Sequence, residues 1–109
     1  MHELSIAESV VAAVLERTGD RRVNTVRLQV GRLSGVVPDA LMFCFELAAT
    51  GTALAGAELQ IEVPSGRAHC RECRQDFDLD DLILLCGCGS ADVEVLAGRE
   101  LQLMSVEVV

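Results

Sequence analysis

The sequence predicts an α+β fold, in which two helices and a small mixed sheet are interrupted by a compact module carrying four of the five cysteines. Two segments have apolar residues at helical spacing, and several others alternate in the manner of strands. The cysteines of the module arrive in two close pairs. We therefore expect one domain formed by 1–65 and 92–109, with 66–91 as an inserted module. A chain of 109 residues can bury one modest core without disulfides.

The first helix is expected from Glu3 to Arg17, with Gly19 ending it. Its apolar positions recur every three or four residues, as in an amphipathic helix; they are Leu4, Ala7, Val10, Val11, Val14 and Leu15. The segment Val23 to Val30 then alternates and predicts a half-buried strand. Its buried face should hold Val26, Leu28 and Val30, and its outer face Thr25, Arg27 and Gln29.

The second helix is expected from Pro38 to Ala49, because proline suits a first helical position, where its missing N–H has no partner to lose. The run Leu41 to Phe45 is apolar nearly all round, which predicts that this helix is the more buried of the two. A second strand follows, in which Leu59, Ile61 and Val63 alternate with polar residues until Pro64 stops it.

Two further strands are expected after the cysteines, at Val93–Leu96 and Leu101–Val108, joined by a turn at Gly98–Arg99. The alternating apolar residues of the last strand need an apolar face to cover. We therefore expect this strand to return to the sheet of the first domain, which makes the cysteine module an insertion.

The charge balance excludes several classes of partner. The chain has 17 acidic and 9 basic residues, all of the basic ones arginine, for a formal charge of −8. Its longest basic run is Arg21–Arg22 and its only aromatic residues are three phenylalanines. We therefore expect no binding of nucleic acid, either through its phosphates or by stacking on its bases.

No apolar run approaches the roughly 18 residues of a membrane span, and the acidic residues near the start are untypical of a signal peptide. We expect a cytoplasmic protein with reduced cysteines.

The strongest motif is Cys70-x-x-Cys73, followed after twelve residues by Cys86-x-Cys88. Two chelating pairs on tight turns are typical of a zinc-ribbon-like site with four thiolate ligands. Gly87 and Gly89 offer a permissive backbone for the second turn. A closed four-sulfur site is structural and folds a module too small for its own core. The single residue between Cys86 and Cys88 implies a more strained chelate than the usual two.

Other interpretations of these residues stay open at this point. The cysteines could form a redox pair, be unrelated thiols, or hold iron in place of zinc. Cys44 is expected to pack in the core as a small hydrophobe. His69 could support the metal site by a hydrogen bond, act as an occasional ligand, or be an exposed loop residue.

The second residue of the chain is a histidine. A free α-amine at Met1, a backbone nitrogen and the imidazole of His2 can close adjacent chelate rings around one cation, and such a nitrogen-rich set suits Ni(II) or Cu(II). The alternative is that His2 is simply exposed.

Four stretches together resemble the HypA/HybF family of hydrogenase maturation factors, the nickel metallochaperones. They are Met1-His2-Glu3-Leu4-Ser5, Gly31-Arg32-Leu33-Ser34 running to Val37-Pro38, Gly51-Thr52 with Ala57, and Cys70-x-x-Cys73 followed by Cys86 and Cys88-Gly89-Ser90. The resemblance covers essentially the whole chain. The family usually has Cys-Pro-x-Cys-Gly-Ser at the second pair, which is one residue longer than here.

The resemblance implies a nickel-binding α/β domain and an inserted zinc domain. It places nickel at Met1, His2 and Glu3, held by the amine, backbone nitrogens and the imidazole, and it assigns zinc to Cys70, Cys73, Cys86 and Cys88. The implied role is delivery of Ni(II) to the apo-NiFe-hydrogenase large subunit, with a HypB-type GTPase as partner and urease maturation proteins as further candidates. The implied protein is no enzyme, and both a monomer and a homodimer are compatible with it.

The rival hypothesis is a zinc-ribbon adaptor that binds protein partners without transporting a metal, so that His2 has no role. An enzyme is the weakest hypothesis, because a closed four-cysteine site has no open coordination position. The sequence also has no Ser/His/Asp set, catalytic carboxylate pair or glycine-rich phosphate loop.

Overall fold

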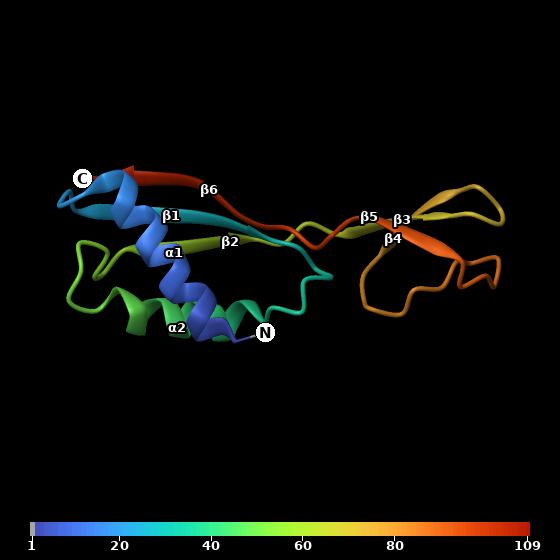
Figure 1. Cartoon of the computed structure of the whole chain (residues 1–109), viewed down its shortest axis with the longest axis horizontal. Coiled ribbons are helices and arrows are strands. Elements are labelled where there is room, and N and C mark those ends of the chain that lie inside the picture. Colours follow the sequence, from blue (N-terminus) through green and yellow to red (C-terminus); the bar gives the residue numbers. More distant parts are fainter. Residues whose placement is uncertain (1) are drawn as a thin grey trace.

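The computed structural model describes residues 2–109 and shows two units arranged end to end along an axis of 53 Å (Figure 1). The first unit contains the helices α1 (Glu3–Thr18) and α2 (Pro38–Ala49) and the strands β1 (Val23–Val30), β2 (Glu58–Glu62) and β6 (Leu101–Val108). The second unit contains β3 (Gly66–Cys70), β4 (Asp76–Leu79) and β5 (Val93–Ala97). The predicted α+β class is confirmed, and the predicted helices and strands occur in the predicted order, but β3 and β4 were not predicted.

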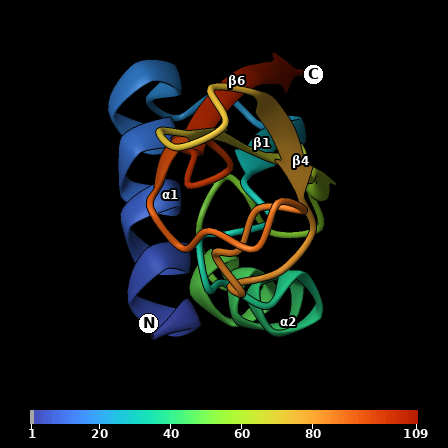
Figure 2. The same cartoon turned by 90° about the vertical axis from the view of Figure 1, so that its right-hand side faces the viewer.

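The first sheet has the order β2-β1-β6, with β1 parallel to β2 and antiparallel to β6. The last strand therefore does return to the first unit, as its alternation predicted. Viewed along the molecule, α1 and α2 lie against the same face of this sheet (Figure 2). Their buried side chains meet those of β1 and β2 in one core; its members are Ala7, Val11, Val14, Val23, Val26, Leu28, Val30, Val36, Leu41, Phe45, Ala49, Leu54 and Leu59.

The ends of both helices follow from local chemistry. Gly19 adopts a positive φ of 60° and donates its N–H to the carbonyl of Leu15 at 2.8 Å, which closes α1 where the sequence predicted. Pro38 occupies the first turn of α2, preceded by Val37 in an extended conformation.

The prediction that α2 is the more buried helix holds only by a small margin, because three of its 12 residues are buried against three of 16 in α1. Each helix buries three residues, and in α2 these are Leu41, Phe45 and Ala49. Met42, Phe43 and Leu47 are 44%, 56% and 57% exposed. The physical reason is that α2 contacts the sheet through a single stripe, so the remaining apolar residues of its sequence face outward.

The expected alternation along β1 is also interrupted at one residue. Thr25, predicted on the outer face, is only 5% exposed. The pairing of β1 with β6 shifts register between Val23 and Thr25. Such a bulge breaks the two-residue period locally, so alternation in the sequence does not assign a face there.

The second sheet has the order β4-β3-β5. β5 pairs with β3, with Cys70 opposite Val93, although the sequence-based boundary at residue 92 left this strand with the first domain. We propose that the inserted unit spans 66–97. Its core is small and consists of Ala68, Leu79 and, from the loop after β1, Leu33. Among residues 2–109, no helix is long and apolar enough to cross a membrane.

Candidate metal centre

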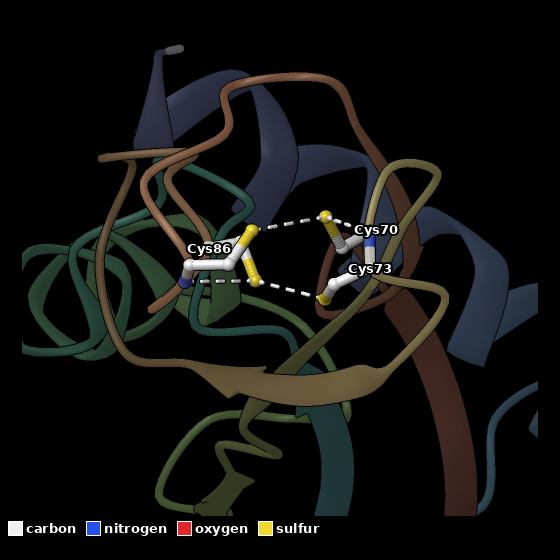
Figure 3. A group of neighbouring side chains, drawn as sticks. Cys70, Cys73 and Cys86 are labelled. Atoms are coloured by element: carbon white, nitrogen blue, oxygen red, sulfur yellow. Dashed lines mark hydrogen bonds between the residues drawn. The ribbon is translucent and has the colours of Figure 1, made fainter.

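Four cysteine sulfurs meet at one end of the second unit (Figure 3). Cys70 ends β3 and Cys73 lies in the turn that follows it, while Cys86 and Cys88 lie in the segment between β4 and β5. The four Sγ atoms all lie within 4.8 Å of one another. Sγ of Cys70 is 3.7 Å from that of Cys88, and Sγ of Cys73 is 3.6 Å from that of Cys86.

These distances fit a tetrathiolate metal site. A tetrahedron with metal–sulfur bonds of about 2.3 Å has sulfur–sulfur edges of about 3.8 Å, close to the two shortest separations. Within the part of the chain that the structure describes, this is the one group of three or more cysteine, histidine or acidic side chains arranged to hold an ion. The predicted convergence of the two cysteine pairs is confirmed.

The first pair is shaped by a tight turn. The N–H of Cys73 points to Sγ of Cys70 at 3.5 Å, and the N–H of Arg74 donates to the carbonyl of Cys70 at 2.8 Å. Arg74 takes a positive φ of 62° to allow this, which is rare for a residue other than glycine. Backbone N–H groups directed at sulfur stabilise the thiolate form that a metal needs.

The second pair repeats this geometry with one residue fewer. The N–H of Cys88 points to Sγ of Cys86 at 3.5 Å, and the N–H of Gly89 donates to the carbonyl of Cys86 at 2.9 Å. Gly89 has a positive φ of 95°, as its expected permissive role requires, whereas Gly87 does not. The shortened Cys86-Gly87-Cys88 spacing therefore still brings both sulfurs to the cluster.

The electrostatics of the cluster favour binding of a cation. The N–H of Cys73 and neighbouring thiols lower the pKa of Cys70 to about 6 against burial. Backbone N–H groups also favour the other three thiolates, yet the combined effect of burial and adjacent sulfurs raises the pKa of Cys73, Cys86 and Cys88. Four thiolates so close together repel one another, and a divalent cation among them removes that cost.

His69 stands apart from the cluster. It lies in β3 next to Cys70, not in a loop, and adjacent strand residues point to opposite faces. Its Nδ1 is 2.7 Å from Oδ1 of Asp76 on β4, so the ring is engaged by a carboxylate on the exposed face. This geometry favours a hydrogen bond to Asp76 over the ligand role.

Cys44, the fifth cysteine, is half-buried on α2 and packs against the core of the first unit. This confirms the prediction that it acts as a small hydrophobe and separates it from the metal cluster.

Of the predicted nickel residues, His2 and Glu3 lie at the start of α1, and Met1 is outside the described residues. His2 is exposed, has an extended backbone, and accepts the N–H of Ile6 at 3.2 Å through its carbonyl oxygen. Glu3 is the first helical residue, so its N–H has no acceptor within the helix. The imidazole of His2 and the amide N–H of Glu3 therefore take part in none of the hydrogen bonds of α1.

The carboxylate of Glu3 has a partner that the sequence did not reveal. Oε2 of Glu3 accepts the N–H of Val37 at 3.3 Å, and this hydrogen bond lowers the pKa of Glu3. Val37 precedes α2, so the starts of the two helices are joined. Figure 1 shows the beginning of α1 beside the loop that leads into α2. The two residues are 34 positions apart and the donor is a backbone N–H, so no pattern in the sequence predicts this hydrogen bond.

The fold and the site define a small α+β protein with an inserted tetrathiolate unit. Residues 1–108 match the model of a family described as "HypA: Hydrogenase/urease nickel incorporation, metallochaperone, hypA". The chain belongs to the HypA family, as its motifs suggested; that family comprises metallochaperones that serve metalloenzyme maturation.

Individual relatives agree over nearly the full length. A hydrogenase maturation factor HypA of a Nostoc species is 42% identical over 108 residues, covering 99% of this chain and 96% of the relative. The protein of the same name from Streptomyces avermitilis is 47% identical over 112 residues, covering 97% and 86%. The solution structure of the Ni metallochaperone HypA from Helicobacter pylori has a TM-score of 0.66 at 23% identity, covering 100% of this chain and 98% of that one, and shares the fold.

Proposed function

We propose that this chain binds Ni(II) at its N-terminus and delivers it to the precursor of a NiFe-hydrogenase large subunit. The ligands in this proposal are the α-amine of Met1, the backbone nitrogens of His2 and Glu3, and the imidazole of His2. The observation that carries it is the exposed His2 at the very start of α1, in a chain of the nickel metallochaperone family. A partner can reach such a site directly.

The chemistry of the two sites supports different roles, one for a transported metal and one for a structural metal. Nitrogen donors of backbone and imidazole suit Ni(II), and a terminal site open to solvent lets a partner's ligands replace them one by one. The four thiolates of Cys70, Cys73, Cys86 and Cys88 would hold Zn(II) and leave it no open position. We assign zinc the structural role and nickel the transported one.

The proposed partners are those that the resemblance to the HypA family implies. They are the hydrogenase large-subunit precursor that receives the metal and a HypB-type GTPase that acts in the same delivery, with urease maturation proteins as further candidates. We place this exchange in the cytoplasm, where both apo-enzyme precursors and reduced thiols are available.

The test is nickel binding measured by calorimetry on zinc-loaded protein with its native N-terminus. His2→Ala should abolish saturable nickel binding, because one chelate ring is lost. His69→Ala is the matched control, since His69 is the only other histidine and is held by Asp76. A one-residue extension at the N-terminus should weaken binding as strongly as His2→Ala, because it displaces the amine. Equal binding by the unaltered protein and His2→Ala would instead favour an adaptor without nickel transport.

A further inference from the structure

The loop of residues 31–37, which joins β1 to α2, has one buried side chain in each unit. Leu33 is 4% exposed and belongs to the core of the cysteine-bearing unit, with Ala68 and Leu79. Val36 is 8% exposed and belongs to the core of the first unit. The loop therefore packs into the cores of both units, at the junction where the two units meet.

The backbone of this loop is bonded to both connections between the units. The N–H of Gly31 donates to Glu100 at 2.8 Å, the N–H of Leu33 donates to Gly98 at 2.7 Å, and the N–H of Arg32 donates to Pro64 at 3.0 Å, each to a carbonyl oxygen. Three chain segments thus meet at the junction through backbone hydrogen bonds.

Leu33 lies against Gly66 of the second unit and Gly98 of the connection that follows this unit. A Cβ on Gly66 would come within 2.4 Å of Cδ1 of Leu33, and a Cβ on Gly98 would come within 3.0 Å of the same atom. Gly66 begins β3, which ends at the metal ligand Cys70. A shift of this sheet would therefore displace Leu33 directly.

The far end of the loop reaches the proposed nickel site. Within the loop, the N–H of Ser34 donates to the carbonyl of Gly31 at 3.0 Å and the N–H of Val36 donates to Oγ of Ser34 at 3.2 Å. The loop then ends at Val37, whose N–H is held by the carboxylate of Glu3. Only four positions separate Leu33 from this contact, and the hydrogen bonds keep the loop tightly turned.

We propose that this loop is a positioning element for the nickel site, and that Leu33 couples the site to the cysteine-bearing unit. The inference rests on the proposed function, because it takes nickel to bind at the start of α1. Neither Leu33 nor Val37 contacts nickel. Leu33 fixes the loop, the loop fixes the N–H of Val37, and this N–H holds Glu3 so that the first residues of α1 keep the geometry that binds the metal.

The test compares two buried leucines of the same small core. Leu33→Ala and Leu79→Ala remove similar volume from the second unit, and Leu79 is 5% exposed, but only Leu33 lies on the loop. Both variants should lower the thermal stability of that unit. Leu33→Ala should weaken nickel binding about fivefold or more, while Leu79→Ala should leave it within about twofold, with zinc content and melting temperature measured on each sample.

A second variant keeps the proposal testable if Leu33→Ala does not fold. Val37→Pro removes the N–H that Glu3 accepts, and the φ of −90° at this position lies near the range that proline takes. Nickel binding should weaken to a similar degree in this variant, with zinc content unchanged.

The outcomes separate this inference from the proposed function. Nickel affinity equal to that of the unaltered protein in Leu33→Ala or in Val37→Pro would overturn the positioning role and leave nickel binding intact. Equal weakening by Leu33→Ala and Leu79→Ala would overturn the role of the loop. Absence of nickel binding in the unaltered protein would overturn the proposed function as well.

Discussion

The two units of the molecule reach a folded state by different means. The first buries thirteen apolar residues between two helices and a sheet. The second buries three, of which Leu33 comes from the first unit's loop, and its four cysteines lie together instead. A core of this size supplies little of the free energy that offsets chain entropy. The comparison shows that one unit is held by apolar burial and predicts that the other depends on a metal.

This division matches the proposed roles of the two sites. A metal that supports the fold must be held tightly, and four clustered thiolates, two of them buried, can do so. A metal that is passed on must be reachable, and His2 is exposed at the end of a helix. In the proposed function, the same chain thus retains one cation and transfers the other.

The largest expected effect is from removal of the thiolate-bound metal. Chelation, or Cys73→Ala, should unfold β3, β4 and β5, because structural zinc contributes about 10–16 kcal/mol in small domains. The amide signals of β1 and β2 should keep their dispersion in a two-dimensional NMR spectrum. Cys44→Ala is the control and should leave both the metal and the second unit intact. A loss of the β1 signals together with those of β3 would contradict the division.

The next largest effect concerns the apolar core of the first unit. Phe45 is 2% exposed, so Phe45→Ala should lower the free energy of unfolding by about 3–5 kcal/mol. Phe43, on the same helix, is 56% exposed, and Phe43→Ala should change it by less than about 0.5 kcal/mol. Urea unfolding followed by circular dichroism would measure both. Similar losses from the two variants would show that the assigned burial of α2 is wrong.

A smaller effect is expected where the units touch. A Cβ on Gly31 would lie 2.1 Å from the carbonyl oxygen of Gly98, an atom of the backbone that cannot rotate away. Gly31→Ala should therefore cost about 1–3 kcal/mol of stability. A Cβ on Gly87 would have no atom within 4 Å, so Gly87→Ala should leave the stability nearly unchanged. Thermal unfolding of both variants would measure the difference. Full stability of Gly31→Ala would mean that the junction is loosely packed.

Acidification should separate the two metal sites. Amine and imidazole nitrogens bind a metal only when deprotonated, so nickel should be released below about pH 6, while zinc held by four thiolates persists. Metal content after equilibrium dialysis across a pH series would report both ions on one sample. Release of zinc before nickel would contradict the assignment of the two sites.

The smallest effect is the titration of Glu3. The N–H of Val37 lowers the pKa of this carboxyl below its ordinary value of 4.5. A lowered folded-state pKa means that the contact stabilises the start of α1 above the ordinary pKa and loses this effect as the pH falls through the lowered value. NMR titration of the Glu3 carboxyl should give that lower midpoint, with the Val37 amide following it. A midpoint at or above 4.5 would show that the hydrogen bond is not formed in solution.

Several features were determined by the sequence itself. Helical spacing and the residues Gly19 and Pro38 located both helices to within about a residue, because these signals act within one or two turns. The spacing of the cysteines predicted their convergence, since four thiols that bind one cation need little beyond two tight turns. The motifs distributed along the whole chain are likewise sufficient to indicate the family.

Other features were decided only by the tertiary structure. Alternation shows that a strand has two faces, but not which neighbour pairs with it, and so β5 joined β3 and not the first sheet. An apolar residue can be buried by any surface that reaches it, which left Phe43 exposed and drew Leu33 from a loop into the core of the other unit. The hydrogen bond from Val37 to Glu3 depends on a backbone N–H, which every residue except proline carries, so only the folded chain could select it.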